Sequence, residues 1–221
     1  MIKAIIFDAD GTLYGINTYR AYKATADFLE SCNGINADKI LLEWKNTISK
    51  INLSGLDSTN PLKRSRQYAL MRTFEELKFN SENINQFVAE SLDIFWKVAI
   101  EDLESSQFCL SSIKELKERY TLVVASEEFY ENLILKLNHI FGDWEKYFKF
   151  LITPEVTGTM KPSEKYYIKA MEKLELSSSE ILVIGDSHRR DIAPAEKLGM
   201  KTLLFNFNEM DGLLEKIKKI A

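Results

Sequence analysis

The sequence contains few of the residues that cross-link small proteins. Among its 221 residues there are only two cysteines and two histidines. Cys32 and Cys109 are far apart and lack the spacing of metal ligands, so we expect no disulfide framework. A reducing compartment suits such a chain, and we therefore expect a cytoplasmic protein.

An excess of basic residues and long apolar runs are also missing. The 29 Lys and Arg residues and 33 Asp and Glu residues give a formal net charge of −4. This balance argues against a broad nucleic-acid-binding face, although a site for a small anion can be locally positive on an acidic protein. No apolar run approaches the length that crosses a bilayer, and Met1–Asp8 turns acidic too early for a signal peptide. We expect neither a nucleic-acid nor a membrane partner, and the oligomeric state stays open.

The residues that are present suit a globular protein with a substantial core, since 45% are hydrophobic and 28% are charged. Five short apolar runs predict buried strands, and helical patterns separate the later ones. This alternation predicts an α/β fold, a Rossmann-like parallel sheet with helices on both faces. The predicted strands are residues 4–7, 121–125, 149–152, 181–184 and 201–205, and the predicted helices are residues 127–140, 163–174, 192–198 and 209–220.

The stretch from residue 15 to 104 breaks this alternation. It contains long helical patterns and no convincing strand, which predicts an inserted α-helical domain. The α/β core domain would then consist of residues 1–14 and 105–221. The predicted helices of the insertion are residues 19–29, 39–51, 62–77 and 84–103, with turn residues such as Asn60-Pro61 between them.

Asp8 and Asp10 follow the first predicted strand, in the segment Asp8–Leu13. Ligands of open parallel sheets bind at the carboxyl ends of strands, and strand residues two apart point to the same side, so these carboxylates can converge. Close carboxylates repel each other, and a Mg²⁺ ion relieves that repulsion. A plain strand-to-turn exit is the alternative, in which Gly11 provides unusual backbone angles. Yet four fixed residues such as Asp-x-Asp-Gly-Thr arise by chance about once in 10⁵ positions.

A second acidic pair follows the fourth predicted strand. Asp186 ends that strand, which should lie near the first one, and it adds a third carboxylate at the same sheet edge. Asp191 begins the next helical pattern. There it could support the metal site, or it could simply favour the helix dipole.

Lys161 and Ser126 also follow predicted strands. Pro162 restricts Lys161 towards extended backbone conformations, and a lysine near a carboxylate keeps it ionised and neutralises phosphate. Ser126 stands before a helical pattern, where it could serve only as an N-cap or could also help to bind phosphate at the helix N-terminus. For a lone lysine, a solvated surface position is the ordinary alternative.

Together these segments resemble the haloacid dehalogenase (HAD) superfamily, and specifically its phosphatase branch. Asp8–Leu13 is similar to the first motif, Ser126 to the second, Lys161-Pro162 to the third and Gly185–Asp191 to the fourth, in the family's order. Thr153–Gly158 resembles the subgroup whose helical cap lies between the first two motifs, as in phosphoglycolate phosphatases. The resemblance spans the sheet-forming parts of nearly the whole chain.

The resemblance implies a phosphatase that hydrolyses a small phosphate monoester of a metabolite in two steps. Asp8 would attack phosphorus and form an aspartyl-phosphate. Asp10 would protonate the leaving oxygen and then activate water. The inserted residues 15–104 would form an α-helical cap domain.

The resemblance also implies a set of binding residues. Mg²⁺ would be bound by Asp8, by Asp10 through its backbone carbonyl, and by Asp186, with Asp191 as a further ligand or as support for Lys161. Ser126 and Lys161 would hold the phosphate oxygens, together with the backbone N–H of Glu127. That glutamate departs from the family, since many relatives have a smaller or neutral residue there.

A second departure is the basic stretch Ser187–Arg190, which could neutralise the acidic cluster, contact substrate or merely start a helix. Further residues in or beside the insertion could line an entrance, or could be ordinary surface residues. These are Tyr14, Lys45, Lys63, Arg64 and Arg66.

Three other activities use similar residues. A haloacid dehalogenase needs the Asp8 nucleophile but normally lacks an acid two residues later, so Asp10 favours a phosphatase. A receiver-type phospho-acceptor arranges its acids on different strands and lacks an insertion of this size. A phosphosugar mutase forms the same aspartyl-phosphate, and water exclusion by the cap would decide between mutase and hydrolase.

Overall fold

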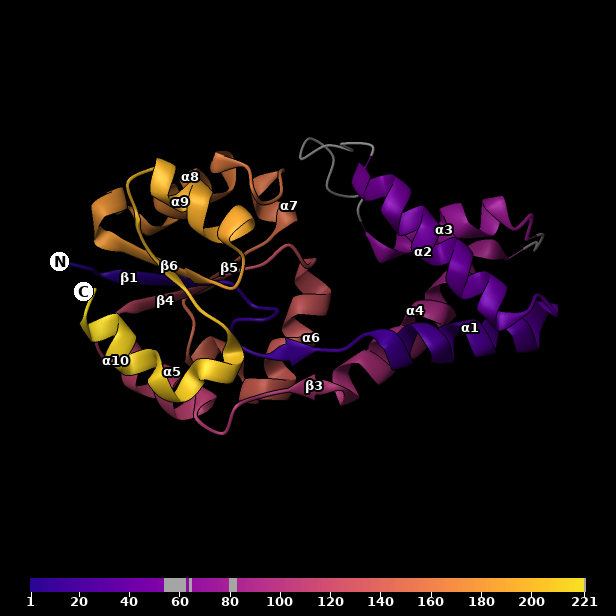
Figure 1. The fold of residues 1–221 in the computed structure, drawn as a ribbon, viewed down its shortest axis with the longest axis horizontal. Coiled ribbons are helices and arrows are strands. Elements are labelled where there is room, and N and C mark those ends of the chain that lie inside the picture. The colour runs from indigo at the N-terminus through magenta and orange to yellow at the C-terminus, as the bar shows by residue number, and fades with distance from the viewer. Residues whose placement is uncertain (54–62, 64, 80–82, 221) are drawn as a thin grey trace. The chain divides into compact units, whose positions relative to one another are not determined.

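The computed structural model describes residues 1–53, 63, 65–79 and 83–220 of the chain (Figure 1). The chain divides into two compact units. Unit 1 comprises Met1–Ile16 and Leu103–Ala221, and unit 2 comprises Asn17–Asp102. Leu62, the start of one predicted helix, and the predicted turn Asn60-Pro61 lie outside the described residues.

A short ribbon marks the points where the chain leaves and re-enters unit 1. Strand β2 (Gly15–Ile16) pairs antiparallel with β3 (Leu103–Glu104), with Gly15 opposite Glu104 and Ile16 opposite Leu103. Because both short strands belong to unit 1, the observed division lies inside the segment 15–104 that the sequence marks as inserted.

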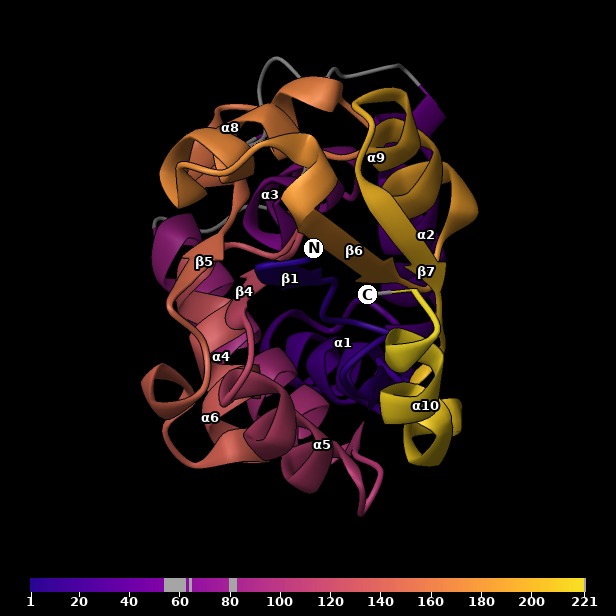
Figure 2. The ribbon, with the colours of Figure 1, turned by 90° about the vertical axis from the view of Figure 1, so that its left-hand side faces the viewer.

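The core of unit 1 is a parallel five-stranded sheet in the order β5–β4–β1–β6–β7 (Figure 2). The predicted parallel sheet is therefore confirmed, and each predicted strand is found with its ends displaced by at most one residue. The strands are β1 (Ala4–Phe7), β4 (Thr121–Ala125), β5 (Phe150–Ile152), β6 (Ile181–Gly185) and β7 (Lys201–Leu204).

Helices cover both faces of this sheet, which explains why its central strand is an unbroken apolar run. Ala4 and Ile6 of β1 join the apolar cluster beneath α8 and α9, whereas Ile5 and Phe7 join the cluster on the opposite face. All four side chains are fully buried. Figures 1 and 2 show α8 (Glu164–Leu174) and α9 (Ala193–Lys197) on one face, and α5 (Cys109–Lys117), α6 (Tyr130–Phe141) and α10 (Leu213–Lys218) on the other.

Several helices of unit 1 differ from the prediction. Helix α5 was not predicted, although Cys109, Ile113 and Leu116 are buried at helical spacing. Helix α6 begins at Tyr130 rather than at residue 127, because residues 126–129 form a turn. The remaining short elements are α7 (Pro154–Thr157), 3₁₀ turns at Trp144–Lys146, Ser178–Glu180 and Phe207–Gly212, and a π-helical turn at His188–Ile192.

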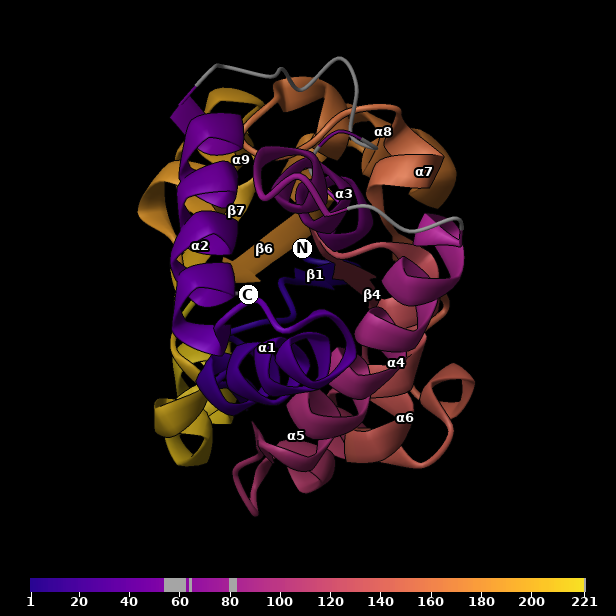
Figure 3. The ribbon, with the colours of Figure 1, turned by 90° about the vertical axis from the view of Figure 1, so that its right-hand side faces the viewer.

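The described residues of unit 2 form a group of four helices (Figure 3). Helix α1 packs against α2 and α4, and α3 also packs against α2 and α4. The shared core includes Trp44, whose ring lies edge-on to Tyr22 with centroids 4.7 Å apart. In the described part of the chain, no helix combines the length and the apolar character that spanning a membrane requires. The four helices are α1 (Tyr19–Asn33), α2 (Ala37–Leu53), α3 (Arg66–Glu76) and α4 (Ile84–Glu101).

Truncation of the central strand tests this description of the core. We expect Ile6→Ala to lower the free energy of unfolding by about 2–5 kcal/mol. The Ile6 side chain is fully buried, with 0% of its surface exposed, so its truncation leaves a cavity. The matched control is Ile168→Ala on α8, where the side chain is 38% exposed and the change should stay within about 0.5 kcal/mol. Urea unfolding followed by circular dichroism measures both, and equal losses would contradict the assignment of Ile6 to the core.

Candidate functional site

Three neighbouring strands end at polar residues. Asp8 follows β1, Ser126 follows β4 and Asp186 follows β6. Phe7, the last residue of β1, is paired with Val124 of β4 and Ile184 of β6, so the three strands end at the same edge of the sheet. The sheet register therefore brings these polar residues together from distant parts of the sequence.

Asp8 is held through both of its carboxylate oxygens. The Nζ of Lys161 donates to Oδ1 at 2.6 Å, and the hydroxyl of Thr12 donates to Oδ2 at 3.2 Å. The Asp8 side chain is 13% exposed, which leaves it accessible from one side. Burial raises the pKa of Asp8 to about 7, and the nearby Lys161 ammonium opposes that rise.

Lys161 is a buried cation between two carboxylates. Its Nζ lies 2.6 Å from Oδ1 of Asp8 and 2.6 Å from Oδ1 of Asp191, and its side chain is only 2% exposed. Burial alone would lower its pKa, but the negative charge beside it, from Asp8 first, raises the pKa well above its ordinary value. Lys161 is therefore not the solvated surface lysine that the sequence also allowed.

Asp191 is almost fully buried and accepts several hydrogen bonds. Its Oδ2 accepts from the backbone N–H of Ser187 at 3.1 Å, and its Oδ1 accepts from Lys161 and, at 3.3 Å, from the Tyr167 hydroxyl. Asp191 is an acidic residue in the first turn of the π-helical segment, and because it also pairs with Lys161 it does more than favour the helix dipole. Its contacts fix the position of Lys161.

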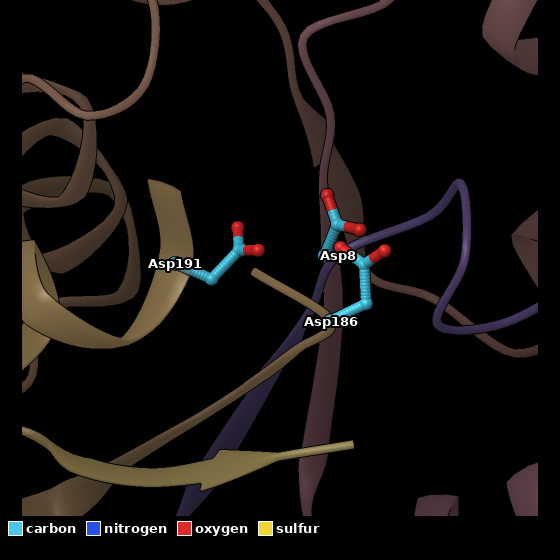
Figure 4. A group of neighbouring side chains, drawn as sticks. All are labelled: Asp8, Asp186 and Asp191. Carbon is cyan, nitrogen blue, oxygen red and sulfur yellow. The ribbon is translucent and has the colours of Figure 1, made fainter. Parts of the chain in front are cut away.

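Three carboxylates form one group at this edge. Each of Asp8, Asp186 and Asp191 provides an oxygen such that all three oxygens lie within 4.8 Å of one another. Figure 4 shows the carboxylates of Asp8 and Asp186 side by side and that of Asp191 turned towards them. Oxygen donors of this kind suit a hard divalent cation such as Mg²⁺.

Asp186 has the features expected of a residue that faces a cation. Among the described residues, its Oδ1 atom is buried and accepts no hydrogen bond, while Nη2 of Arg190 lies 3.9 Å away. Burial raises the pKa of Asp186, and Arg190 opposes this rise. A bound dication would lower that pKa, so the donor set fits a metal.

Gly11 allows the backbone to approach Asp186 closely. It has a positive φ of +88°, and a Cβ atom there would lie 2.3 Å from Oδ2 of Asp186. Two features therefore require glycine at this position, as the sequence predicts: the backbone conformation and the close packing against Asp186.

Asp10 is not a member of the three-carboxylate group and has its own cationic partner. Its Oδ1 and Oδ2 atoms accept hydrogen bonds from Nζ of Lys136 at 2.9 and 2.8 Å. The metal role predicted for Asp10 stays a prediction. Sequence reasoning missed Lys136, although a signal was present, because this lysine interrupts the apolar face formed by Leu133, Leu137 and Phe141.

Ser126 does not cap a helix. Its hydroxyl accepts from the backbone N–H of Glu128 at 3.1 Å, whereas the N-cap of α6 is Phe129. The N-cap interpretation is therefore wrong, because a short turn separates β4 from α6. The Tyr166 hydroxyl lies within hydrogen-bonding distance of the backbone carbonyls of Ser126 and Ile152, so it links this turn to β5.

The two departures from the family pattern meet in space. Nη1 of Arg190 lies 3.1 Å from Oε2 of Glu127, and the same guanidinium faces Asp186. Arg190 therefore offsets negative charge from both carboxylates. Of the possible roles of the basic stretch, the contacts favour neutralisation of the acidic residues.

The candidate entrance residues have different surroundings. Tyr14 is fully buried in the core of unit 1, so it is not the ordinary surface residue that the sequence also allowed. Lys45 and Lys63 are exposed, and the guanidinium of Arg66 lies over the Phe95 and Trp96 rings of unit 2. Arg64 lies outside the described residues.

Comparisons with known proteins point to one family. A family model described as haloacid dehalogenase-like hydrolase matches residues 2–199. The "Putative pyrophosphatase PpaX" of Clostridium perfringens is 30% identical over 209 residues, which cover 91% of this chain and 83% of that protein. The ribulose-1,5-bisphosphate 5-phosphatase of Halopiger xanaduensis is 24% identical over 129 residues, which cover 58% of this chain and 54% of that protein.

Solved structures share the fold at low sequence identity. A 2-haloacid dehalogenase from Pseudomonas syringae superposes with a TM-score of 0.68 at 19% identity, covering 98% of this chain and 100% of that one. The magnesium-bound HAD-hydrolase YfnB from Bacillus subtilis has a TM-score of 0.63 at 18% identity, covering 97% of this chain and 99% of that one. At such identities the similarity establishes the fold alone.

The pKa of Asp8 predicts a pH dependence of stability in metal-free protein. The folded pKa of about 7 exceeds the ordinary value of 3.8, so the folded state retains a proton that the unfolded state loses. The resulting stabilisation is present at acidic pH and is lost as the pH rises towards 7. Relative to Asp8→Asn, which does not titrate, the wild type should lose on the order of 1 kcal/mol per pH unit between about pH 4 and 7.

Urea unfolding of both proteins in EDTA, at several values of pH, measures this difference. A difference that stays constant with pH, or that changes in the opposite direction, would contradict the raised pKa.

Proposed function

The chain belongs to the haloacid dehalogenase-like hydrolases, and from this premise we propose that it is a magnesium-dependent phosphatase of small phosphate monoesters. The observation that carries the proposal is the placement of two acids of the first motif. Asp8 lies beside Lys161 at the end of β1, and Asp10 is anchored separately by Lys136. Relatives named as a pyrophosphatase and a sugar-bisphosphate phosphatase support phosphate chemistry.

In the proposed first step, Asp8 is the nucleophile. One of its carboxylate oxygens forms a bond to phosphorus while the bond from phosphorus to the leaving oxygen breaks. Asp10 gives its proton to that oxygen, so an alcohol leaves and an aspartyl-phosphate remains on Asp8. The contacts of Thr12 and Lys161 hold the Asp8 carboxylate in a fixed orientation for this attack.

In the second step, water releases the phosphate. Asp10, now a carboxylate, takes a proton from water as the water oxygen bonds to phosphorus. The bond between phosphorus and Asp8 breaks, which yields inorganic phosphate and the original carboxylate. The same two acids therefore serve both half-reactions.

Three groups are proposed to hold the phosphate oxygens. Ser126 directly follows β4, at the edge of the sheet that holds Asp8, and it would provide its hydroxyl. Lys161 lies on the segment after β5 and would provide its ammonium group, which contacts Asp8. The backbone N–H of Glu127 would provide another donor, as in anion-binding turns. The pairing of the Glu127 carboxylate with Arg190 reduces the repulsion that this carboxylate would exert on a phosphate.

Asp8, Asp186 and the backbone carbonyl of Asp10 would hold Mg²⁺, with Asp191 as a ligand or as the residue that fixes Lys161. When bound, the ion would offset the charges of the carboxylates and of the phosphate. The geometry of the three-carboxylate group and the buried Oδ1 of Asp186 support this assignment. YfnB, which shares the fold, is described as bound to magnesium.

We further propose that unit 2 acts as the cap domain that sets substrate choice and excludes water, in line with the inserted position of Asn17–Asp102. A mutase would form the same aspartyl-phosphate, and a dehalogenase would use the same nucleophile. Asp10 favours the phosphatase over the dehalogenase. The expected cytoplasmic location and the absence of nucleic-acid and membrane partners stay predictions.

Replacing the nucleophile provides the direct test. We expect Asp8→Asn to lower kcat for p-nitrophenyl phosphate by at least about a thousandfold, because the amide oxygen cannot form the acyl phosphate. Asp143→Asn is the matched control, since Asp143 is 48% exposed and pairs with Lys146. Steady-state kinetics on folded proteins gives both values, and normal turnover by Asp8→Asn would refute the proposed nucleophile.

Metal removal tests the cation. We expect EDTA to abolish turnover and added Mg²⁺ to restore it, because Asp8, Asp186 and Asp191 place three carboxylates within one small group. Mg²⁺ should also raise the melting temperature of the wild type more than that of Asp186→Asn. Full turnover in EDTA, together with no thermal effect of Mg²⁺, would exclude the proposed metal.

A further inference from the structure

Helix α6 has a lysine on its buried face. Lys136 lies between Leu133 and Leu137 in the sequence and is fully buried with them. Burial of an ammonium group is strongly unfavourable unless the charge is paired and hydrogen-bonded. Such a lysine therefore requires compensating contacts.

Two carboxylates provide this compensation. Nζ of Lys136 donates to both oxygens of Asp10, at 2.9 and 2.8 Å, and lies 3.3 Å from Oε2 of Glu128. Glu128 is itself fixed, because its Oε1 accepts from the backbone N–H of Phe129 at 3.2 Å and from the Asn132 side chain at 3.3 Å. Glu128, just before α6, thus holds Lys136, and Lys136 in turn holds Asp10.

Asp10 is held by a buried lysine but remains partly exposed. Its side chain is 38% exposed, whereas the Lys136 side chain that contacts it is 0% exposed. The carboxyl group is therefore held in place by Lys136 and is still accessible to a reacting group. General acid–base catalysis needs such placement, since small displacements of the acid greatly reduce proton transfer.

We propose that Lys136 is a positioning residue for Asp10, with Glu128 as the residue that positions Lys136. The inference rests on the proposed function and deepens it. In the first step, the bond from phosphorus to the leaving oxygen breaks, its electron pair goes to that oxygen, and the Asp10 proton moves there. Lys136 donates no proton to the substrate; it fixes the carboxyl from which the proton comes.

This role has a signature that depends on the leaving group. p-Nitrophenolate is a stable anion and departs without much help from an acid, whereas phenolate depends more on protonation. The value of kcat/KM reports steps up to the transfer of phosphoryl to Asp8, so it includes leaving-group departure. A residue needed only for folding would reduce kcat/KM for both esters by the same factor.

The experiment compares p-nitrophenyl phosphate with phenyl phosphate in the full-length protein with Mg²⁺. We expect Lys136→Met to reduce kcat/KM for phenyl phosphate by about tenfold more than for p-nitrophenyl phosphate. Asp10→Asn should show the same selective loss to a greater extent. The matched control is Lys169→Met, an exposed lysine paired with Glu172, which should leave both values unchanged.

A second variant keeps the test independent of the stability of Lys136→Met. Glu128→Gln retains the lysine and Asp10 but removes the second charge that holds the lysine. We expect a selective loss in the same direction, though smaller. Equal factors for both esters in the folded variants would overturn the role of Lys136, whereas a wild type inactive on both esters would instead overturn the proposed phosphatase function.

Discussion

The group of acids around Asp8 depends on the buried ammonium of Lys161. Lys161 lies 2.6 Å from carboxylate oxygens of both Asp8 and Asp191, and it joins the residue after β1 to the turn after β6. Without that cation, two buried acids would face each other in a medium that screens their repulsion poorly. The ion-pair triad therefore makes a dense group of acids compatible with a stable fold, and it keeps one face of Asp8 accessible.

A second buried lysine, Lys136, compensates the negative charge of Asp10, the other acid of the first motif. Asp8 and Asp10 are two residues apart, yet each is held by its own buried cation, Lys161 in one case and Lys136 in the other. These lysines come from separate parts of unit 1, one after β5 and one within α6. The two acids can therefore have different surroundings, which suits the different parts that we propose for them, one as nucleophile and one as proton carrier.

Much of the fold was accessible from the sequence because strand patterns are local. The apolar runs at residues 4–7 and 121–125 identify strands directly, and the parallel direction of the strands follows from their alternation with helices. The convergence of Asp8, Ser126 and Asp186 then follows from the topology, and the structure brings these residues to one edge.

The features that the sequence did not predict are those that depend on tertiary contacts. Lys136 is 126 positions from Asp10 in the sequence, so no local pattern connects them. The four-residue turn that separates β4 from α6 was missed because serine and two glutamates are also typical of a helix start. For Tyr14 the sequence also allowed an ordinary surface position, but it is buried in the core.

The β2–β3 ribbon has a consequence for how this architecture can vary. Because Gly15 lies opposite Glu104, the chain departs and returns at points about 5 Å apart, whatever lies between them. For the sheet, the intervening helices are therefore equivalent to a loop whose two ends are held together. The spacing of the strands does not depend on the number or length of those helices. Exchange of the whole helical segment for a shorter or longer one is open to evolution and to protein engineering, with the strand register at the edge that carries Asp8 unchanged.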